Sequence, residues 1–130
     1  FGFSLTPSPT CNLLVIRSPD IDRAVAFYEC IGLRFQKHSH GNGPLHYASD
    51  SNHFVFEIYP SRNQEDMTNK TRFGFRVDNV DSIVGALAQL GATIRTSPTD
   101  TEWGRRAVVN DLDGHTVELV ATTRGVQAGG

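Results

Sequence analysis

The sequence predicts an α+β fold of two tandem βαβββ modules, which form a cupped, barrel-like mixed sheet with the helices outside. Three observations lead to this prediction. The stretch 16–33 returns in degenerate form 59 positions later, at 75–92. Each copy has the apolar spacing of an amphipathic helix, and short β-rich runs stand before and behind it. The chain is therefore expected to be an internal duplication.

Both helices show the same pattern and the same boundaries. Their apolar residues fall at i, i+3, i+4 and i+7, namely Ile21, Ala24, Val25 and Tyr28 in the first and Val80, Ile83, Val84 and Leu87 in the second. Ser18 is predicted to cap the first helix, 19–31, and Asp78 to cap the second. Gly32 and Gly91 stand where a helix leaves through a left-handed conformation.

The strands follow from runs of β-branched and aromatic residues between turn signals. In the first half they are expected at 11–17, 33–37, 45–49 and 53–59. In the second half they are expected at 73–77, 92–96, 105–110 and 115–121. The modules are accordingly 12–60 and 71–122, joined by a polar linker at 61–70. Residues 1–11 are expected to be a disordered or vector-derived end, and 123–130 a flexible tail.

Composition excludes several classes of function. The 12 basic and 14 acidic residues form no basic run, so nucleic acid is not expected as a partner. No apolar stretch approaches the roughly 20 residues that cross a bilayer, so no membrane association is expected. Cys11 and Cys30 favour two reduced thiols in a cytoplasmic protein, with a disulfide between them as the alternative.

The two copies, with DIDRAVAFYECIGL after the first strand and NDLDGHTVEL near the end, resemble the vicinal oxygen chelate superfamily. That superfamily includes glyoxalase I, extradiol dioxygenases, fosfomycin resistance enzymes and bleomycin-binding proteins. The resemblance covers residues 12–122 and concerns the fold, because members with different reactions share these motifs. It implies that catalytic members hold one divalent metal in the cup, on side chains from the first and last strand of each half.

Two of these four ligand positions carry carboxylates in this chain. The resemblance places Glu57 and Glu118 on the last strands, and strand alternation turns both away from the helices. It places Leu13 and Arg72 on the leading strands, where histidine is usual, or Asn12 in place of Leu13 if the following turn is one residue longer. The expected state has no cofactor, and the alternative is a divalent Ni, Zn, Mn or Fe ion on Glu57 and Glu118.

Arg72 changes the electrostatics of this site. A guanidinium is protonated at physiological pH and cannot ligate a cation. We therefore expect Arg72 to pair with Glu57 or Glu118, with its charge where related proteins hold the metal. If either glutamate is catalytic, it is expected to act as an acid or base, with a pKa that partial burial raises and Arg72 lowers again.

Further residues are candidates for lining the cup. His46 is the candidate for completing a metal site, and otherwise an edge or core residue. Trp103 is expected at the mouth of the cavity, either as a stacking wall for a planar ligand or packed against the other half, with Arg105 beside it. Phe35 and Tyr59 are candidate apolar walls.

Arg17 and Arg76 occupy equivalent positions in the two copies. On the strand pattern both face the cup. They either clamp a carboxylate or phosphate of a ligand, or form salt bridges to acidic neighbours.

The ligand positions separate the functional hypotheses. The first is a protein similar to the bleomycin resistance branch that binds a small molecule in the cup without a complete metal site. The second is a divalent-metal-dependent lyase, isomerase or dioxygenase that uses Glu57 and Glu118. Leu13 and Arg72 favour the first hypothesis. A non-catalytic interaction module with a filled cup is a third. A homodimer is expected, with the cup closed within one chain or by exchange between two.

Overall fold

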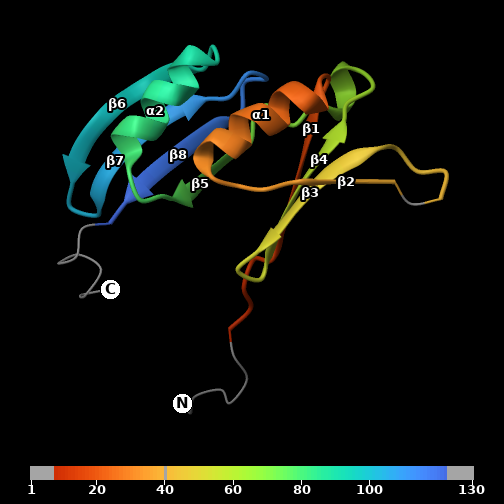
Figure 1. Cartoon of the computed structure of the whole chain (residues 1–130), viewed down its shortest axis with the longest axis horizontal. Helices are drawn as coiled ribbons and strands as arrows, with labels where there is room; N and C mark the ends of the chain where they lie inside the picture. Colours follow the sequence, from red (N-terminus) through yellow and green to blue (C-terminus); the bar gives the residue numbers. More distant parts are fainter. Residues whose placement is uncertain (1–7, 40, 123–130) are drawn as a thin grey trace.

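The protein consists of two four-stranded mixed sheets with one helix each (Figure 1). The computed structural model describes residues 8–39 and 41–122; the predicted tail and most of the predicted N-terminal segment lie outside them. The strand order is β1-β4-β3-β2 in the first sheet and β5-β8-β7-β6 in the second. The predicted α+β fold of two tandem βαβββ modules is confirmed.

The first module has its five elements in the predicted order. They are β1 (Leu13–Ser18), α1 (Ile21–Ile31), β2 (Gln36–His38), β3 (His46–Ser51) and β4 (Phe54–Pro60). β1 pairs in parallel with β4, whereas β4 and β2 both pair antiparallel with β3. The β3–β4 turn falls at Asn52 and His53, both with positive φ, and not at 50–52, because β3 continues through Ser51.

The second module repeats this order. Its elements are β5 (Arg72–Arg76), α2 (Val80–Gln89), β6 (Thr93–Thr101), β7 (Gly104–Asn110) and β8 (Thr116–Ala121). β5 pairs in parallel with β8, and the other pairings are antiparallel. β6 is longer than predicted and contains register shifts against β7. The linker holds a short 3-10 helix, η1 (Gln64–Asp66), that the sequence pattern did not indicate.

The helix caps differ from the prediction by two positions in the first helix and one in the second. Asp20 and Asn79, not Ser18 and Asp78, cap the helices, and each side chain accepts the backbone N–H group three residues further on, at 3.1 and 3.0 Å. The two caps keep the 59-residue offset, so the duplication extends to them. The predicted left-handed exits are present at Gly32 and Gly91, with φ of 124° and 103°.

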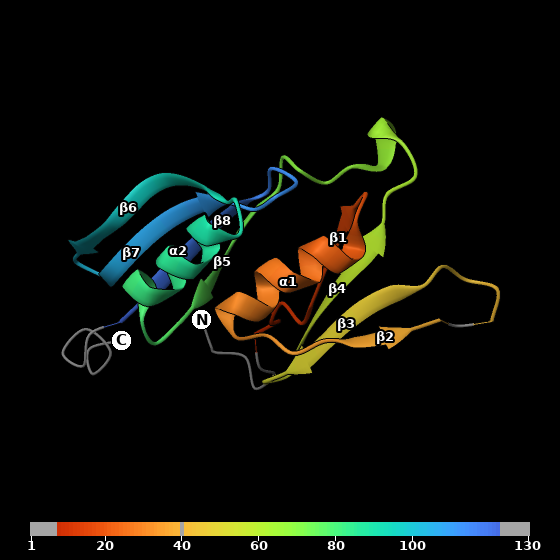
Figure 2. The same cartoon turned by 45° about the horizontal axis from the view of Figure 1, so that its top comes forward.

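The two halves share one hydrophobic core on the helix side of both sheets. Tyr28 of α1 has ring-centroid distances of 4.9 Å to Phe56 in the first sheet and of 6.2 and 6.1 Å to Phe73 and Phe75 in the second. Figures 1 and 2 show α1 beside α2 and next to β5. The helix-covered faces of the two sheets therefore meet in this core.

Each sheet has an opposite face, which we call the first and the second outer face. The first outer face comprises Leu13, Val15 and Arg17 of β1, Val55, Glu57 and Tyr59 of β4, and His46, Ala48 and Asp50 of β3. The second comprises Arg72, Gly74 and Arg76 of β5, Thr116, Glu118 and Val120 of β8, and Arg106, Val108 and Asn110 of β7. Because the helix-covered faces meet, both outer faces are turned away from the core.

The first outer face is open in the single chain. Ile16 is fully buried on the helix side of β1, whereas its neighbour Val15 is 36% exposed and Leu13 is 50% exposed.

In the part of the chain that the structure describes, neither helix is long and apolar enough to cross a membrane. Cys11 and Cys30 are free thiols.

Candidate functional site

Glu118 lies between two guanidinium groups on the second outer face. Arg106 donates from Nε to Oε1 at 3.1 Å, and Arg72 donates from Nε and Nη2 to Oε2. Burial alone would raise the pKa of Glu118, but the hydrogen bonds from Arg72 and Arg106 outweigh it and lower the pKa. The carboxylate is therefore held in its charged form with both oxygens engaged, and the arginines more than offset the rise in pKa that burial alone would cause.

Gly74 makes room for this arrangement. Gly74 and Glu118 face each other across the β5–β8 pair. A Cβ atom at Gly74 would lie 3.1 Å from the carbonyl oxygen and 3.2 Å from the Cβ of Glu118. Val15 occupies the equivalent place in the first module, opposite Glu57. The two outer faces therefore differ in the space beside the glutamate.

Glu57 has different neighbours on the first outer face. His46 Nε2 lies 3.8 Å from Glu57 Oε2, and the His46 ring stacks on Tyr59 with a centroid distance of 4.1 Å. The guanidinium of Arg17 lies over the Tyr59 ring, 5.3 Å from its centroid, and donates a hydrogen bond to the Pro60 carbonyl at 3.2 Å. His46 is 2% exposed, so it is part of the packed sheet.

The register places the two remaining predicted ligand positions as counted from the sequence. Leu13 lies two residues before Val15, which faces Glu57, and Arg72 lies two residues before Gly74, which faces Glu118. Leu14 packs against the core, so the alternation turns Asn12 to the helix side and leaves Leu13 on the outer face. The two remaining predicted ligand positions are therefore occupied by the apolar side chain of Leu13 and the guanidinium of Arg72.

Three other predictions about the cup require correction or qualification. Phe35 contacts Tyr47 and Phe56 on the helix side, yet it also borders a hollow together with Ala48, Asp50 and Val55 of the first outer face. Arg105 does not turn inward, because its guanidinium binds Asp81 of α2 and Asp100 at 2.9 and 3.2 Å. Trp103 lies in the β6–β7 turn and is 64% exposed, so the predicted packing against the other half is absent.

Neither outer face of the single chain offers, by itself, a complete set of ligands for a divalent metal. Both oxygens of Glu118 accept hydrogen bonds from arginines, and the positive charge of those arginines opposes a cation. Leu13 offers no donor atom. Glu57 has only His46 nearby as a second nitrogen or oxygen ligand from its own sheet among the described contacts.

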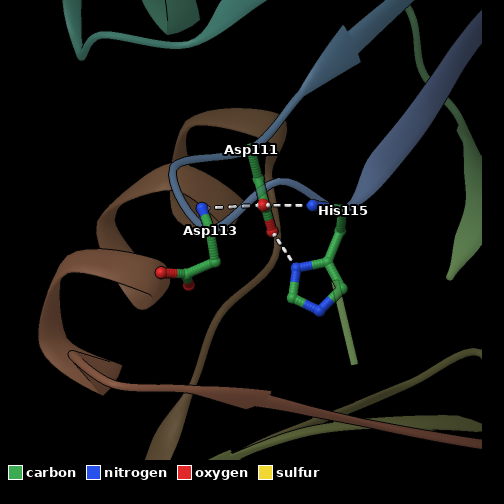
Figure 3. Close-up of side chains that lie close together, drawn as sticks. All are labelled: Asp111, Asp113 and His115. Atoms are coloured by element: carbon green, nitrogen blue, oxygen red, sulfur yellow. Dashed lines mark hydrogen bonds and ion pairs between the residues drawn. The ribbon is translucent and has the colours of Figure 1, made fainter. Parts of the chain in front are cut away.

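A second polar cluster, not anticipated from the sequence, joins the two modules. We call Tyr28, Thr68, Asp111 and His115 the polar junction. The Tyr28 hydroxyl donates to Asp111 Oδ2 at 2.5 Å, and His115 Nδ1 lies 2.8 Å from the same oxygen (Figure 3). His115 Nε2 lies 2.6 Å from Thr68 Oγ1, which also accepts the Arg17 backbone N–H at 2.9 Å.

The junction, together with Asp113 beside it, has the residue types of a metal site, but most of the donor atoms are already engaged. Asp113 Oδ2 is a buried oxygen without a hydrogen-bond partner among the described residues. Ligand atoms of Asp111, Asp113 and His115 lie within 4.8 Å of one another. However, Asp111 Oδ1 already accepts the backbone N–H groups of Asp113 and His115, and the Asp113 carboxylate points away from the pair toward α1 in Figure 3, where Arg23 binds it at 3.0 Å. We interpret the cluster as a structural link between the halves.

Protonation agrees with this interpretation. Burial alone would raise the pKa of Asp111, but hydrogen bonds from His115 and Tyr28 outweigh it and lower the pKa. Burial, together with the charge of Asp111, raises the pKa of Tyr28 well above its ordinary value. The junction therefore contains an ionised Asp111 that accepts from a neutral tyrosine.

Sequence reasoning missed Arg106 and the polar junction for different reasons. Arg106 alternates with buried Ala107 and Val109 on β7, so strand periodicity would have placed it beside Glu118. The bond between Tyr28 and Asp111 joins residues 83 positions apart. No local pattern indicates such a contact.

Two tandem βαβββ modules with a glutamate at the matching strand position of each outer face define a class of protein. A family model described as the Glyoxalase/Bleomycin resistance protein/Dioxygenase superfamily matches residues 10–119. The chain therefore belongs to this superfamily, as its sequence motifs indicated. No curated protein matches the chain at a significant level.

Solved structures agree with this assignment. A glyoxalase family protein from Bacillus cereus is similar with a TM-score of 0.73 and 15% identity, over 93% of this chain and 99% of that chain. The antibiotic-binding protein TnmS3 from Streptomyces sp. CB03234 has a TM-score of 0.68 and 21% identity, over 91% and 99%. TioX from Micromonospora sp. ML1 has 0.66 and 21%, over 88% and 100%. At these identities the likeness concerns the fold.

Proposed function

We propose that this protein binds a small molecule on its outer faces without a metal. The observation that carries the proposal is the pairing of Glu118 with Arg72 and Arg106, which leaves neither carboxylate oxygen free for a cation. The description of TnmS3 as an antibiotic-binding protein supports a binding role within this fold. The chemistry expected of such a site is recognition of a ligand, with Glu118 serving to position arginines.

We further propose that a second copy of the chain completes the cup. Leu13 and Val15 form an exposed apolar strip on β1, which is an edge strand of its sheet. Closing the cup within one chain would require the shared aromatic core and the Tyr28–Asp111 bond to break. Exchange between two copies needs no such rearrangement, since the first outer face of one can cover the second outer face of the other in a closed dimer.

Charge also favours this pairing. The second outer face carries three arginines and one glutamate, namely Arg72, Arg76, Arg106 and Glu118. The first carries two carboxylates and one arginine, namely Glu57, Asp50 and Arg17. Faces of opposite excess charge attract each other, whereas two identical faces repel.

The alternative proposal is a divalent-metal-dependent lyase, isomerase or dioxygenase that uses Glu57 and Glu118. One observation favours it. His46 Nε2 and Glu57 Oε2 lie 3.8 Å apart, and imidazole nitrogen with carboxylate oxygen suits Ni, Zn, Mn or Fe. The alternative requires Glu118 to leave its two arginines.

Elemental analysis separates the two proposals. The protein is purified without chelator, exposed to nickel, zinc, manganese or iron(II), desalted and assayed, together with Glu57→Gln and Glu118→Gln. We expect no stoichiometric metal in any sample. Near-stoichiometric metal in the wild type that is lost in both variants would overturn the metal-free proposal and support the alternative.

Analytical ultracentrifugation tests the second copy. We expect a dimer for the wild type and a monomer for Leu13→Lys, because the lysine would place a charge in the buried strip. Leu90→Lys is the control, since Leu90 is also an exposed leucine but caps the end of α2, away from both outer faces. A monomeric wild type, or a Leu13→Lys variant that remains dimeric, would contradict exchange.

A cytoplasmic location is also proposed, supported by the two free thiols. Cys11 is exposed and Cys30 is half-buried. Alkylation of the protein in freshly lysed cells with a mass-tagged maleimide should modify Cys11 fully. A Cys11 protected from alkylation until a reductant is added would contradict this location.

A further inference from the structure

The second outer face has more positive charge than its own residues neutralise. Of the residues that β5, β7 and β8 place on this face, Arg72, Arg76 and Arg106 are cationic and only Glu118 is anionic. Glu118 is shared by Arg72 and Arg106. Arg76 is exposed, and its guanidinium makes no hydrogen bond or ion pair within the described part of the chain.

The geometry lets the three guanidinium groups converge. Arg76 and Arg106 flank Val120 in one row across the sheet, about 10 Å apart at the strand spacing of roughly 4.8 Å. Arg72 lies four residues before Arg76 on the same face of β5 and forms an ion pair with Glu118. Glu118 lies on β8 between the residues that face Arg72 and Arg76. An arginine side chain spans most of these distances, and each guanidinium keeps N–H groups that Glu118 does not use.

Glu118 orders these arginines without cancelling their charge. One carboxylate neutralises one of the three cations, and its lowered pKa keeps it ionised while two guanidinium planes are fixed against it. Guanidinium N–H groups recognise carboxylate, sulfonate or phosphate oxygens in this way, often with two bonds per group.

We infer that the ligand of the cup carries an anionic group, which Arg76 binds together with the free N–H groups of Arg72 and Arg106. This inference rests on the proposed binding function. The apolar body of the ligand lies against Tyr59 of the first outer face, next to the strip of Leu13 and Val15 at the contact between copies. The ligand class is therefore an apolar or aromatic molecule with one carboxylate, sulfonate or phosphate group.

A pair of fluorescent dyes tests the inference. 8-Anilinonaphthalene-1-sulfonate and N-phenyl-1-naphthylamine have the same aromatic body, and only the first carries a sulfonate. We expect the sulfonate dye to bind the full-length protein about tenfold more tightly, which is the size of a charge-assisted hydrogen bond. Added sodium chloride should weaken binding of the sulfonate dye and leave the neutral dye unchanged, since salt screens charges.

Variants assign the effect to the arginines. Arg76→Gln should lose most of the tenfold preference for the sulfonate dye. Arg76→Lys should keep part of it, because lysine retains the positive charge but not the planar pair of N–H donors. Arg62→Gln is the matched control, because this linker arginine pairs with Asp66 and lies outside the outer faces.

The outcomes distinguish failure of the inference from failure of the proposed function. If both dyes bind equally and Arg76→Gln changes neither, the anionic class is wrong and the binding function stands. If neither dye binds the wild type, the proposed function fails and the inference falls with it. A salt-sensitive preference for the sulfonate dye that Arg76→Gln abolishes supports both.

Discussion

The two modules have the same fold but use it differently. In the first, α1 lies between its own sheet and the other half, and five of its residues are buried, namely Ala24, Val25, Phe27, Tyr28 and Ile31. In the second, α2 buries three, namely Val80, Val84 and Leu87. The outer faces also differ, because the first combines apolar side chains with an excess of carboxylates, whereas the second is basic.

This comparison shows which positions of a duplicated unit are constrained. The helix stripe and the inward strand residues of each copy must bury against a sheet, so their apolar character remains in both. The outer-face positions contact no core, so Val15 can correspond to Gly74 and Leu13 to Arg72. Because the outer faces could diverge in this way, the second module carries the arginines of the proposed binding site.

The largest effect is expected from the residue that distinguishes α1 from α2. Tyr28 and Leu87 are equivalent and both fully buried, and the Tyr28 ring also contacts Phe73 and Phe75 of the other module. Tyr28→Ala should lower the free energy of unfolding by about 3–5 kcal/mol, and Leu87→Ala by about 2–4 kcal/mol. Urea unfolding followed by circular dichroism measures both. A Leu87→Ala variant less stable than Tyr28→Ala would remove the asymmetry claimed for the helices.

The polar junction should give the next effect. Asp111→Asn should lower the free energy of unfolding by about 1–3 kcal/mol near neutral pH. The amide NH2 group that replaces one carboxylate oxygen cannot accept a hydrogen bond, whereas Asp111 Oδ2 has both Tyr28 and His115 as partners. Chemical unfolding of both proteins at pH 7 measures the difference. An unchanged free energy of unfolding would show that the junction does not hold the halves together.

Acid adds an independent test of the same group. The folded-state pKa of Asp111 lies below its ordinary 3.8, so its ionised form stabilises the fold fully above pH 3.8 and this contribution is lost as pH falls through the lowered value. The stability of the wild type should therefore fall more steeply than that of Asp111→Asn on acidification below pH 3.8. Parallel curves for the two proteins would contradict the lowered pKa.

Gly74 tests the difference between the outer faces. Gly74→Ala should lower the free energy of unfolding by about 1 kcal/mol, since its Cβ would press on Glu118. Val15→Ala, at the equivalent position, should cost less than this when both variants also carry Leu13→Lys, which is expected to keep the chain monomeric, because Val15 is partly exposed in the single chain. The measurement is thermal unfolding of both variants at equal concentration. Equal stability of Gly74→Ala and the wild type would show that the arginine-bound Glu118 can move.

The smallest effect on stability is expected for Arg72. Its side chain is 57% exposed, so Arg72→Gln should change the free energy of unfolding by less than about 1 kcal/mol, as for other exposed ion pairs. The pKa of Glu118 should rise in the variant, because one of its two donors is lost. Carboxyl-carbon NMR titration reads this pKa directly, and an unchanged value would show that Arg106 alone sets it.

Much of the fold was predictable because its signals are local. The repeat offset, the helix periodicity and the glycines after the helices all act over a few residues, and alternation correctly placed Glu57, Glu118 and Tyr59 on the outer faces. Arg105 was misplaced because strand alternation was not applied to it: it neighbours Arg106 on β7 and therefore faces the opposite, helix-covered side. Phe35 lies before β2, where alternation does not fix the side that a residue faces. Caps were displaced because Ser18, Asp20 and Asp78, Asn79 are all competent cap residues.

The sequence by itself determined that this chain folds as two βαβββ modules of this superfamily, because each copy specifies its own helix and strands. It also determined that Leu13 and Arg72 supply no metal ligand. Only the tertiary structure decided that the helix-covered faces meet, that Arg106 joins Arg72 on Glu118, and that Tyr28 reaches Asp111. The physical reason is that each module satisfies its backbone locally, whereas the placement of one module on the other depends on side chains that are distant in sequence.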